Sequence, residues 1–158
     1  MRKTVLAAAL LLVSLPLGAL AMDEHAAVQP NAIKWGPAPP ALPPGAQLAV
    51  LAGDPGKDGV YTVRVKLPTG YKVPPHTHPT DENVTVLSGA FHIGMGDQLD
   101  AKKGETLKAG GFVHVATGMH HYAWTSAPTV IQIHGMGPFA INYLNPADDP
   151  RNKSAAKQ

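Results

Sequence analysis

Two histidines and a glutamate in residues 70–89 have the residue types and the spacing of metal ligands. In this stretch, GYKVPPHTHPTDENVTVLSG, one residue separates His76 from His78 and three separate His78 from Glu82. Side chains two apart on an extended strand share a face and lie about 6.6 Å apart along the chain. His76 and His78 can therefore reach one cation together, and a bend at 79–81 leads to Glu82 in the next extended run. This ligand set suits iron, manganese, nickel or zinc.

The elements that must position these residues are short alternating runs separated by glycine and proline. From Gln47 onward they read QLAVLAG, VYTVRVKL, ENVTVLSG, AFHIGMG, GGFVHVA, HHYAWT, TVIQIHG and FAINYL. Each run has the length and alternation of a strand, and a spacing of roughly a dozen residues favours an antiparallel sandwich or barrel. We therefore predict one all-β, antiparallel domain over residues 46–146.

The spacing in residues 70–89 resembles the first signature of the cupin superfamily at every marked position. A second signature would follow as GGFVHVATGMHHYAWT, opening at Gly110. In it Ala116 stands where proline is usual and Thr125 where asparagine is usual. His121 falls at the position of the metal-ligand histidine, with His120 as the alternative.

This resemblance implies a small jelly-roll β-barrel in which His76, His78, Glu82 and His121 hold one divalent metal ion, iron, manganese, zinc or nickel. Three imidazoles and a carboxylate leave positions open on a six-coordinate ion, as catalytic metals do. We expect a metalloenzyme that acts on a small organic substrate as an oxygenase, an isomerase or a decarboxylase/lyase. The alternative is a non-catalytic cupin that binds or senses a metal or a small ligand.

Two further polar residues are candidates for catalysis. On TVIQIHG, Gln132 and His134 share one face of the strand and Ile131 and Ile133 share the other. If the polar pair faces the barrel interior, His134 is an acid–base group and Gln132 orients the ligand, while Glu82 is a ligand that could also accept a proton. If the isoleucines face inward, Gln132 and His134 are solvated.

Aromatic and methionine side chains flank the expected ligands. They are Tyr71, Tyr122, Trp124 and Met119. Such side chains could line an aromatic pocket suited to a small organic molecule, or they could simply belong to the hydrophobic core.

The ends of the chain differ in composition from the strand region. Residues 1–21 combine Arg2 and Lys3 with an apolar run and a small-residue cleavage site, which predicts a signal peptide cut after Ala21. We therefore expect a periplasmic or secreted protein that is not attached to the membrane after cleavage. Residues 22–45 form a proline-rich arm, and residues 147–158 form a polar C-terminal tail that we expect to fray.

Charge and cysteine content exclude several classes of partner and ligand. The formal net charge of +2 falls to zero when residues 1–21, which carry two positive charges and no negative ones, are removed. A balanced charge without a basic run predicts no nucleic-acid binding. The chain has no cysteine, so any metal site must use nitrogen and oxygen ligands. The expected partner is a small-molecule ligand. Edge strands and the proline-rich arm are also compatible with a homodimer.

Overall fold

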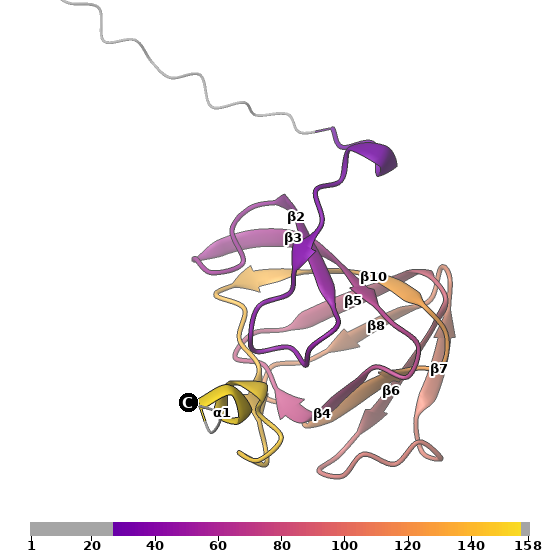
Figure 1. The fold of residues 1–158 in the computed structure, drawn as a ribbon, viewed down its shortest axis with the longest axis vertical. Coiled ribbons are helices and arrows are strands. Elements are labelled where there is room, and N and C mark those ends of the chain that lie inside the picture. Colours follow the sequence, from indigo (N-terminus) through magenta and orange to yellow (C-terminus); the bar gives the residue numbers. More distant parts are fainter. Residues whose placement is uncertain (1–26, 156–158) are drawn as a thin grey trace, which may run out of the picture.

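Two antiparallel β-sheets pack face to face in this computed structural model, which describes residues 27–155 (Figure 1). The six-stranded sheet has the order β1 (Gly36–Pro37), β2 (Gln47–Ala52), β3 (Gly59–Leu67), β10 (Thr129–Gly137), β5 (Glu82–Ser88), β8 (Phe112–Val115). The five-stranded sheet has the order β11 (Asn142–Tyr143), β4 (Lys72–Thr77), β9 (His121–Thr125), β6 (Ala90–Met95), β7 (Glu105–Lys108). The prediction of an all-β, antiparallel jelly-roll fold is confirmed.

The hydrophobic core lies between the two sheets because successive side chains of a strand point to opposite faces. In β3, Tyr61, Val63 and Val65 are buried while the residues between them are only half-buried. Phe91 and Ile93 of β6 supply buried side chains from the five-stranded sheet. The alternation in the sequence therefore specifies which face of each strand enters the core.

Three strands were not predicted from alternation: the two-residue β1 in the arm, β4 and β7. β4 has the sequence KVPPHT, and its pairing with β9 shifts register between Val73 and His76. The shift spans Pro74 and Pro75, which cannot donate to a ladder and so are tolerated where pairing is interrupted. β7 is a four-residue strand at the edge of its sheet, paired with β6. Of the run FAINYL, predicted as one strand, only β11 forms a ladder, with β4.

The described part of the N-terminal arm holds to the barrel by specific contacts. A short 3-10 helix, η1 (Pro30–Ala32), precedes β1, which pairs with β2. The Nζ of Lys66 lies 4.0 Å from the centre of the Trp35 ring, a cation–π contact. The hydroxyl of Tyr71 donates to the carbonyl of Pro43. The predicted signal peptide, residues 1–21, lies outside the described residues.

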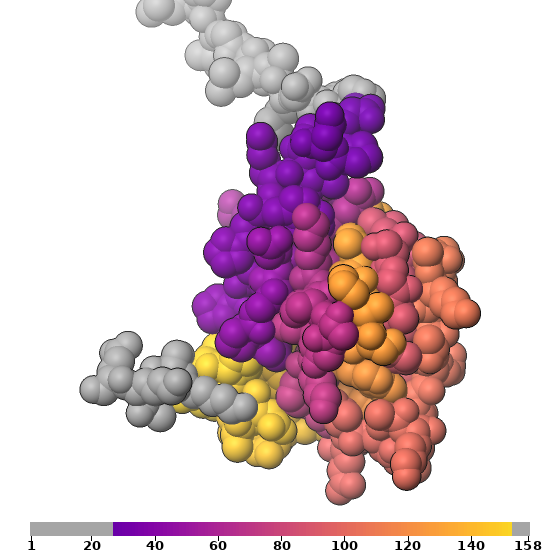
Figure 2. Space-filling view, turned by 45° about the vertical axis from the view of Figure 1, so that its right-hand side comes forward, coloured from indigo at the N-terminus to yellow at the C-terminus, as the bar shows by residue number. Residues whose placement is uncertain are grey.

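The C-terminal segment is anchored, so the expectation that it frays is wrong for residues 149–152. It carries a short helix, α1 (Pro150–Ala155). Arg151 pairs with Asp149 at 2.7 Å and donates to the carbonyl of Ile141 at 3.1 Å. Figure 2 shows this segment, in yellow, beside the arm, in indigo, on one face of the molecule. Within residues 27–155, no helix is long and apolar enough to cross a membrane.

Candidate metal centre

Four side chains from three strands and a loop meet between the two sheets. His76 lies near the end of β4, opposite His121 at the start of β9, and His78 follows directly after β4. Glu82 is the first residue of β5, so it comes from the other sheet. Each of the four is at most 7% exposed. The folding of the two sheets onto one another therefore assembles the site from residues 76 to 121.

The four groups lie close enough together to become ligands of a single ion after small side-chain adjustments. The three histidines each offer a ring nitrogen within 4.8 Å of the others. Glu82 Oε2 lies 3.5 Å from His78 Nε2 and 3.7 Å from His121 Nε2. These separations are long for hydrogen bonds. Donor atoms about 2.1 Å from one ion would lie roughly 3.0–3.5 Å apart, so the cluster requires only small adjustments to hold an ion.

Main-chain carbonyls fix how the three imidazoles point. Each Nδ1 contacts a carbonyl oxygen: His76 that of Pro74 at 2.7 Å, His78 that of Ala140 at 2.7 Å, and His121 that of Met119 at 3.0 Å. A carbonyl only accepts, so Nδ1 carries the proton and Nε2 keeps a lone pair. Metal-binding histidines are held in this way. The buried Nε2 of His78 has no hydrogen-bond partner among residues 27–155, and a metal ion would satisfy it.

The electrostatics of the cluster favour a cation. Burial acts to raise the pKa of Glu82, but the imidazoles of His121 and His78 outweigh burial and hold that pKa well below its usual range. Burial, together with the neighbouring His121 and His78, lowers the pKa of His76 to about 3. Burial also acts to lower the pKa of His78, but the Glu82 carboxylate outweighs it and raises that pKa. Glu82 therefore stays ionised at neutral pH and His76 stays neutral, as metal ligands must be.

The structure separates His121 from the alternative ligand His120. His120 is exposed, and its Nδ1 lies 2.6 Å from Oδ1 of Asp97 at the surface. His121 is 1% exposed and faces His76 across the ladder. Because successive side chains of an extended chain point to opposite faces, only the His121 side chain of this pair points into the core.

The interpretation that Gln132 and His134 face the interior is wrong. Ile131 and Ile133 are buried and line the cavity beside the cluster. Gln132 lies on the outer face of the sheet, where its Oε1 accepts a hydrogen bond from Arg64 Nε at 3.1 Å. His134 lines a separate surface hollow with Asp81. Turning the strand over would bury two polar groups in place of two aliphatic ones, which costs free energy.

The cavity next to the cluster has a volume of about 50 Å³. Among the described residues, its only polar lining groups are the four clustered side chains, and the rest of the wall is aliphatic or phenyl. None of Tyr71, Tyr122, Trp124 and Met119 lines it. Tyr122 and Trp124 stack on each other, with ring centres 5.9 Å apart, and the Tyr122 hydroxyl donates to the carbonyl of Asp100. Of the two alternatives for these four residues, an aromatic pocket beside the cluster is therefore wrong.

The Tyr143 ring lies 6.0 Å from that of His76, centre to centre, and a second aromatic residue, Phe139, touches the cluster without being predicted from the sequence. Its ring stacks on His78, with centres 5.0 Å apart and planes 28° apart. It also meets Tyr61 edge-on at 5.9 Å. No local pattern signals this contact, because the segment after β10 reaches the site only through the tertiary fold.

Comparison with known families agrees with this architecture. Residues 23–140 match the family model described as the ChrR Cupin-like domain. No curated protein matches the chain.

Several solved structures share the fold. A candidate acetylacetone dioxygenase from Methylibium petroleiphilum superposes with a TM-score of 0.60 at 19% identity, over 86% of this chain and 96% of that one. The polyketide cyclase RemF from Streptomyces resistomycificus gives 0.60 at 16% identity, over 82% and 92%. KdgF from a Halomonas species gives 0.53 at 21% identity, over 69% and 92%. At such identities the likeness concerns the fold alone.

Proposed function

The chain belongs to the family of ChrR cupin-like domains, and on that premise we propose that it binds one divalent metal ion through His76, His78, His121 and Glu82. The observation that carries the proposal is the shared orientation of the three buried imidazoles. Each has its Nδ1 on a main-chain carbonyl, so the Nε2 atoms are left for a cation. The ionised Glu82 beside them supplies the negative charge that a buried cation needs.

We further propose that this centre is catalytic and acts on a small organic substrate. When bound, a divalent ion supplies Lewis-acid chemistry, or redox chemistry in the case of iron or manganese. The carbonyls of Pro74, Ala140 and Met119 hold the imidazoles in place, and the apolar wall excludes water from the cavity. Oxygenation, isomerisation and decarboxylation or lyase chemistry are the reaction classes that such a site supports. The candidate dioxygenase and the cyclase among the similar folds are consistent with an enzyme.

A second candidate function has its own observation. A cavity of about 50 Å³ holds only a few water-sized groups, whereas ligand pockets usually measure roughly 300–1,000 Å³. This small size favours a module that binds or senses a metal or a very small ligand without turnover.

Elemental analysis of protein purified from its native compartment tests the metal site. We expect about one equivalent of iron, manganese, zinc or nickel per chain. Protein that retains none of these metals, even after incubation with each followed by dialysis, would contradict the proposal. Oxygen-uptake assays with small aromatic and keto compounds then separate the candidates. Uptake supports the oxygenase class, and tight metal binding without turnover of any compound supports the binding module.

Export and self-association are proposals as well. The composition of residues 1–21 supports export to the periplasm or the medium, with cleavage after Ala21. N-terminal sequencing of the mature protein should then start at Met22. The exposed sheet edges support a homodimer, which light scattering coupled to size-exclusion chromatography would detect as a doubled mass.

A further inference from the structure

A second, larger hollow adjoins the metal-site cavity on the side of the N-terminal arm. This outer hollow has a volume of about 240 Å³. The arm contributes Pro39, Ala41 and Leu42 to its wall, and the segment 139–141 faces them. Pro39 and Gly56 at its border are exposed, so the outer hollow reaches the protein surface.

A single layer of side chains separates the outer hollow from the inner cavity. The residues that line both are Leu42, Leu48, Val63, Phe139 and Ile141. Phe139 is the member of this layer that also stacks on His78. A small movement of Leu42 or Phe139 would therefore connect the surface with the candidate metal centre.

Apolar side chains form most of the lining of both the outer hollow and the inner cavity. In the part of the chain that the structure describes, the residues lining the outer hollow are aliphatic, proline, glycine or phenylalanine, with no charged or hydrogen-bonding side chain among them. In the inner cavity the only polar lining groups of the described chain are the four clustered side chains. A sugar, a nucleotide or a polycarboxylate that entered the outer hollow would lose its hydrogen bonds to water. The lining side chains of the hollow would not replace them. A hydrocarbon group has no hydrogen bonds to lose, and the removal of its apolar surface from water is favourable.

We propose that the outer hollow binds the hydrocarbon body of the substrate and admits it to the metal centre past Leu42 and Phe139. The substrate is then a compact, largely apolar molecule with one polar group for the metal. This inference rests on the proposed metal site and specifies its substrate class. The volume is adequate, since an apolar cavity of about 150 Å³ can bind benzene or xenon.

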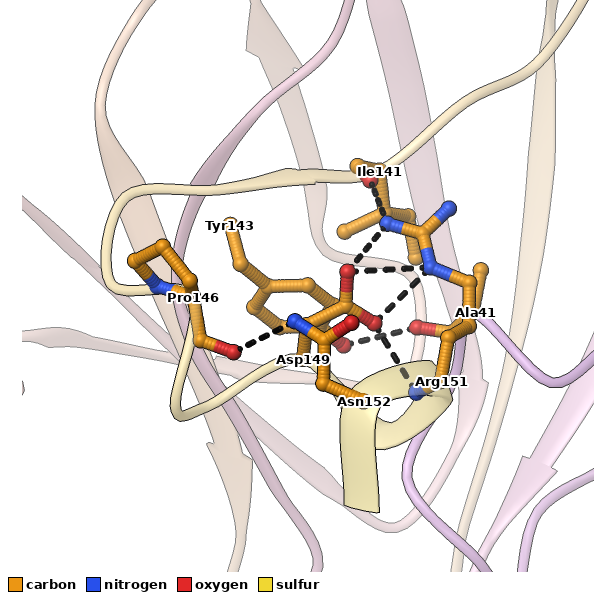
Figure 3. Close-up of polar contacts among 7 residues, drawn as sticks. All are labelled: Ala41, Ile141, Tyr143, Pro146, Asp149, Arg151 and Asn152. Carbon is orange, nitrogen blue, oxygen red and sulfur yellow. Dashed lines mark hydrogen bonds and ion pairs between the residues drawn. The ribbon is translucent and has the colours of Figure 1, made fainter. Parts of the chain in front are cut away.

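Hydrogen bonds from the C-terminal segment hold the outer wall of this hollow in place. Figure 3 shows Arg151 between the carboxylate of Asp149 and the carbonyl of Ile141, and the Tyr143 hydroxyl donating to the carbonyl of Ala41 at 2.8 Å. The first contact holds the segment that carries Phe139 and Ile141, and the second ties that segment to the arm. The hollow is therefore formed before any ligand arrives, which lowers the entropic cost of binding.

Benzene is the probe that tests the outer hollow without relying on activity. Titration of the full-length protein, followed by the methyl NMR signals of Leu42 and Ile141, should show saturable shifts in metal-free and in zinc-loaded protein. Ala41→Trp fills the outer hollow, since Ala41 lines this hollow and not the inner cavity. It should weaken benzene binding at least about tenfold, because the new side chain takes the contacts of the ligand.

A matched control places the same large side chain elsewhere. Ala127, also half-buried, lies in the turn between β9 and β10 and lines neither space. Ala127→Trp should leave benzene affinity within about twofold of the wild type. If Ala41→Trp does not fold, Ala41→Leu fills part of the hollow and should weaken binding by an intermediate amount. Absence of saturable binding to the wild type, or equal affinity in the Ala41 variants, overturns the inference.

Cobalt(II) binding distinguishes failure of this inference from failure of the metal site. The visible spectrum of cobalt-loaded protein should show one equivalent in the wild type, in Ala41→Trp and in Ala127→Trp. Benzene binding without any cobalt site would refute the proposed function and would leave the outer hollow as an apolar ligand site without a metal role. Cobalt binding without benzene binding would refute the hollow and leave the metal site standing.

Discussion

The buried and the surface histidines of this protein have the same side chain and opposite surroundings. His92 Nδ1 lies 2.8 Å from the hydroxyl of Thr106, His114 Nδ1 lies 3.0 Å from the amide oxygen of Asn83, and His120 bonds a carboxylate. These partners are side chains in contact with solvent. In the buried trio the partner of every Nδ1 is a main-chain carbonyl, which cannot rotate away. A rigid main-chain partner and burial, and not the residue type, therefore distinguish the candidate ligands from the other histidines.

The largest effect should follow from removing one buried imidazole. His78→Ala should weaken zinc affinity by more than about 100-fold, since changes to residues that only support a ligand already cost about 10–100-fold. Competition titration with a chromophoric chelator measures this. His114→Ala is the matched control and should leave the affinity unchanged. Equal affinity of the two variants would remove the distinction between the histidine classes.

Neutralising the carboxylate should have the next largest effect. Glu82→Gln keeps the size of the side chain but loses its charge, and it should weaken zinc binding by at least about tenfold. It should also lower the pKa of His78 in the metal-free protein, because Glu82 contributes more than the Ala140 carbonyl to raising that pKa. NMR titration of the ring protons follows this shift. A His78 pKa that is the same in the variant and the wild type would contradict the proposed contact.

The pH dependence of stability should separate the two classes in the metal-free protein. His76 has an ordinary pKa of 6.5 and a folded-state pKa of about 3, so between these values the unfolded chain binds the extra proton. Stability therefore falls as the pH drops from 6.5, by up to about 1.4 kcal/mol per pH unit from this group. Glu82, whose pKa is lowered, adds to the loss at lower pH, whereas the raised pKa of His78 acts in the opposite direction.

Urea unfolding of chelator-treated protein between pH 6.5 and 4.5 measures this slope. His76→Gln should reduce this slope. A stability that rises toward low pH, or a slope unaffected by His76→Gln, would show that the buried imidazole does not resist protonation.

A surface histidine should matter only for local packing. The ring of His92 stacks on Trp124 with centres 4.9 Å apart, and its two nitrogens contact Thr106 and Ser126. His92→Ala should lower the free energy of unfolding by about 1 kcal/mol and leave zinc affinity unchanged. The same urea and chelator measurements check both values, and a large loss of affinity would mean that this face communicates with the metal centre.

The sequence alone was sufficient where local chemistry decides the outcome. Alternation located most strands of the core, β4 excepted, and spacing selected His76, His78 and Glu82. It was insufficient where distant segments meet. Which face of TVIQIHG turns inward depends on the opposing sheet, so Gln132 and His134 could be placed on either side.

The partners that complete the site were also invisible to local patterns. The carbonyl of Ala140 holds His78, and Phe139 stacks on it, although both follow β10 much later in the chain. The Arg151 contact with Ile141 likewise joins a tail of unremarkable composition to the wall of the outer hollow. Main-chain acceptors carry no residue signature, and such contacts become predictable only once the fold is known.

X-ray absorption spectroscopy of the zinc-loaded protein counts the ligands of the ion and so tests whether three histidines and a carboxylate hold it. We predict three imidazole nitrogens at about 2.0–2.1 Å together with at least one oxygen ligand. A spectrum with a single imidazole, or with oxygen ligands alone, would contradict a metal centre built from His76, His78, His121 and Glu82.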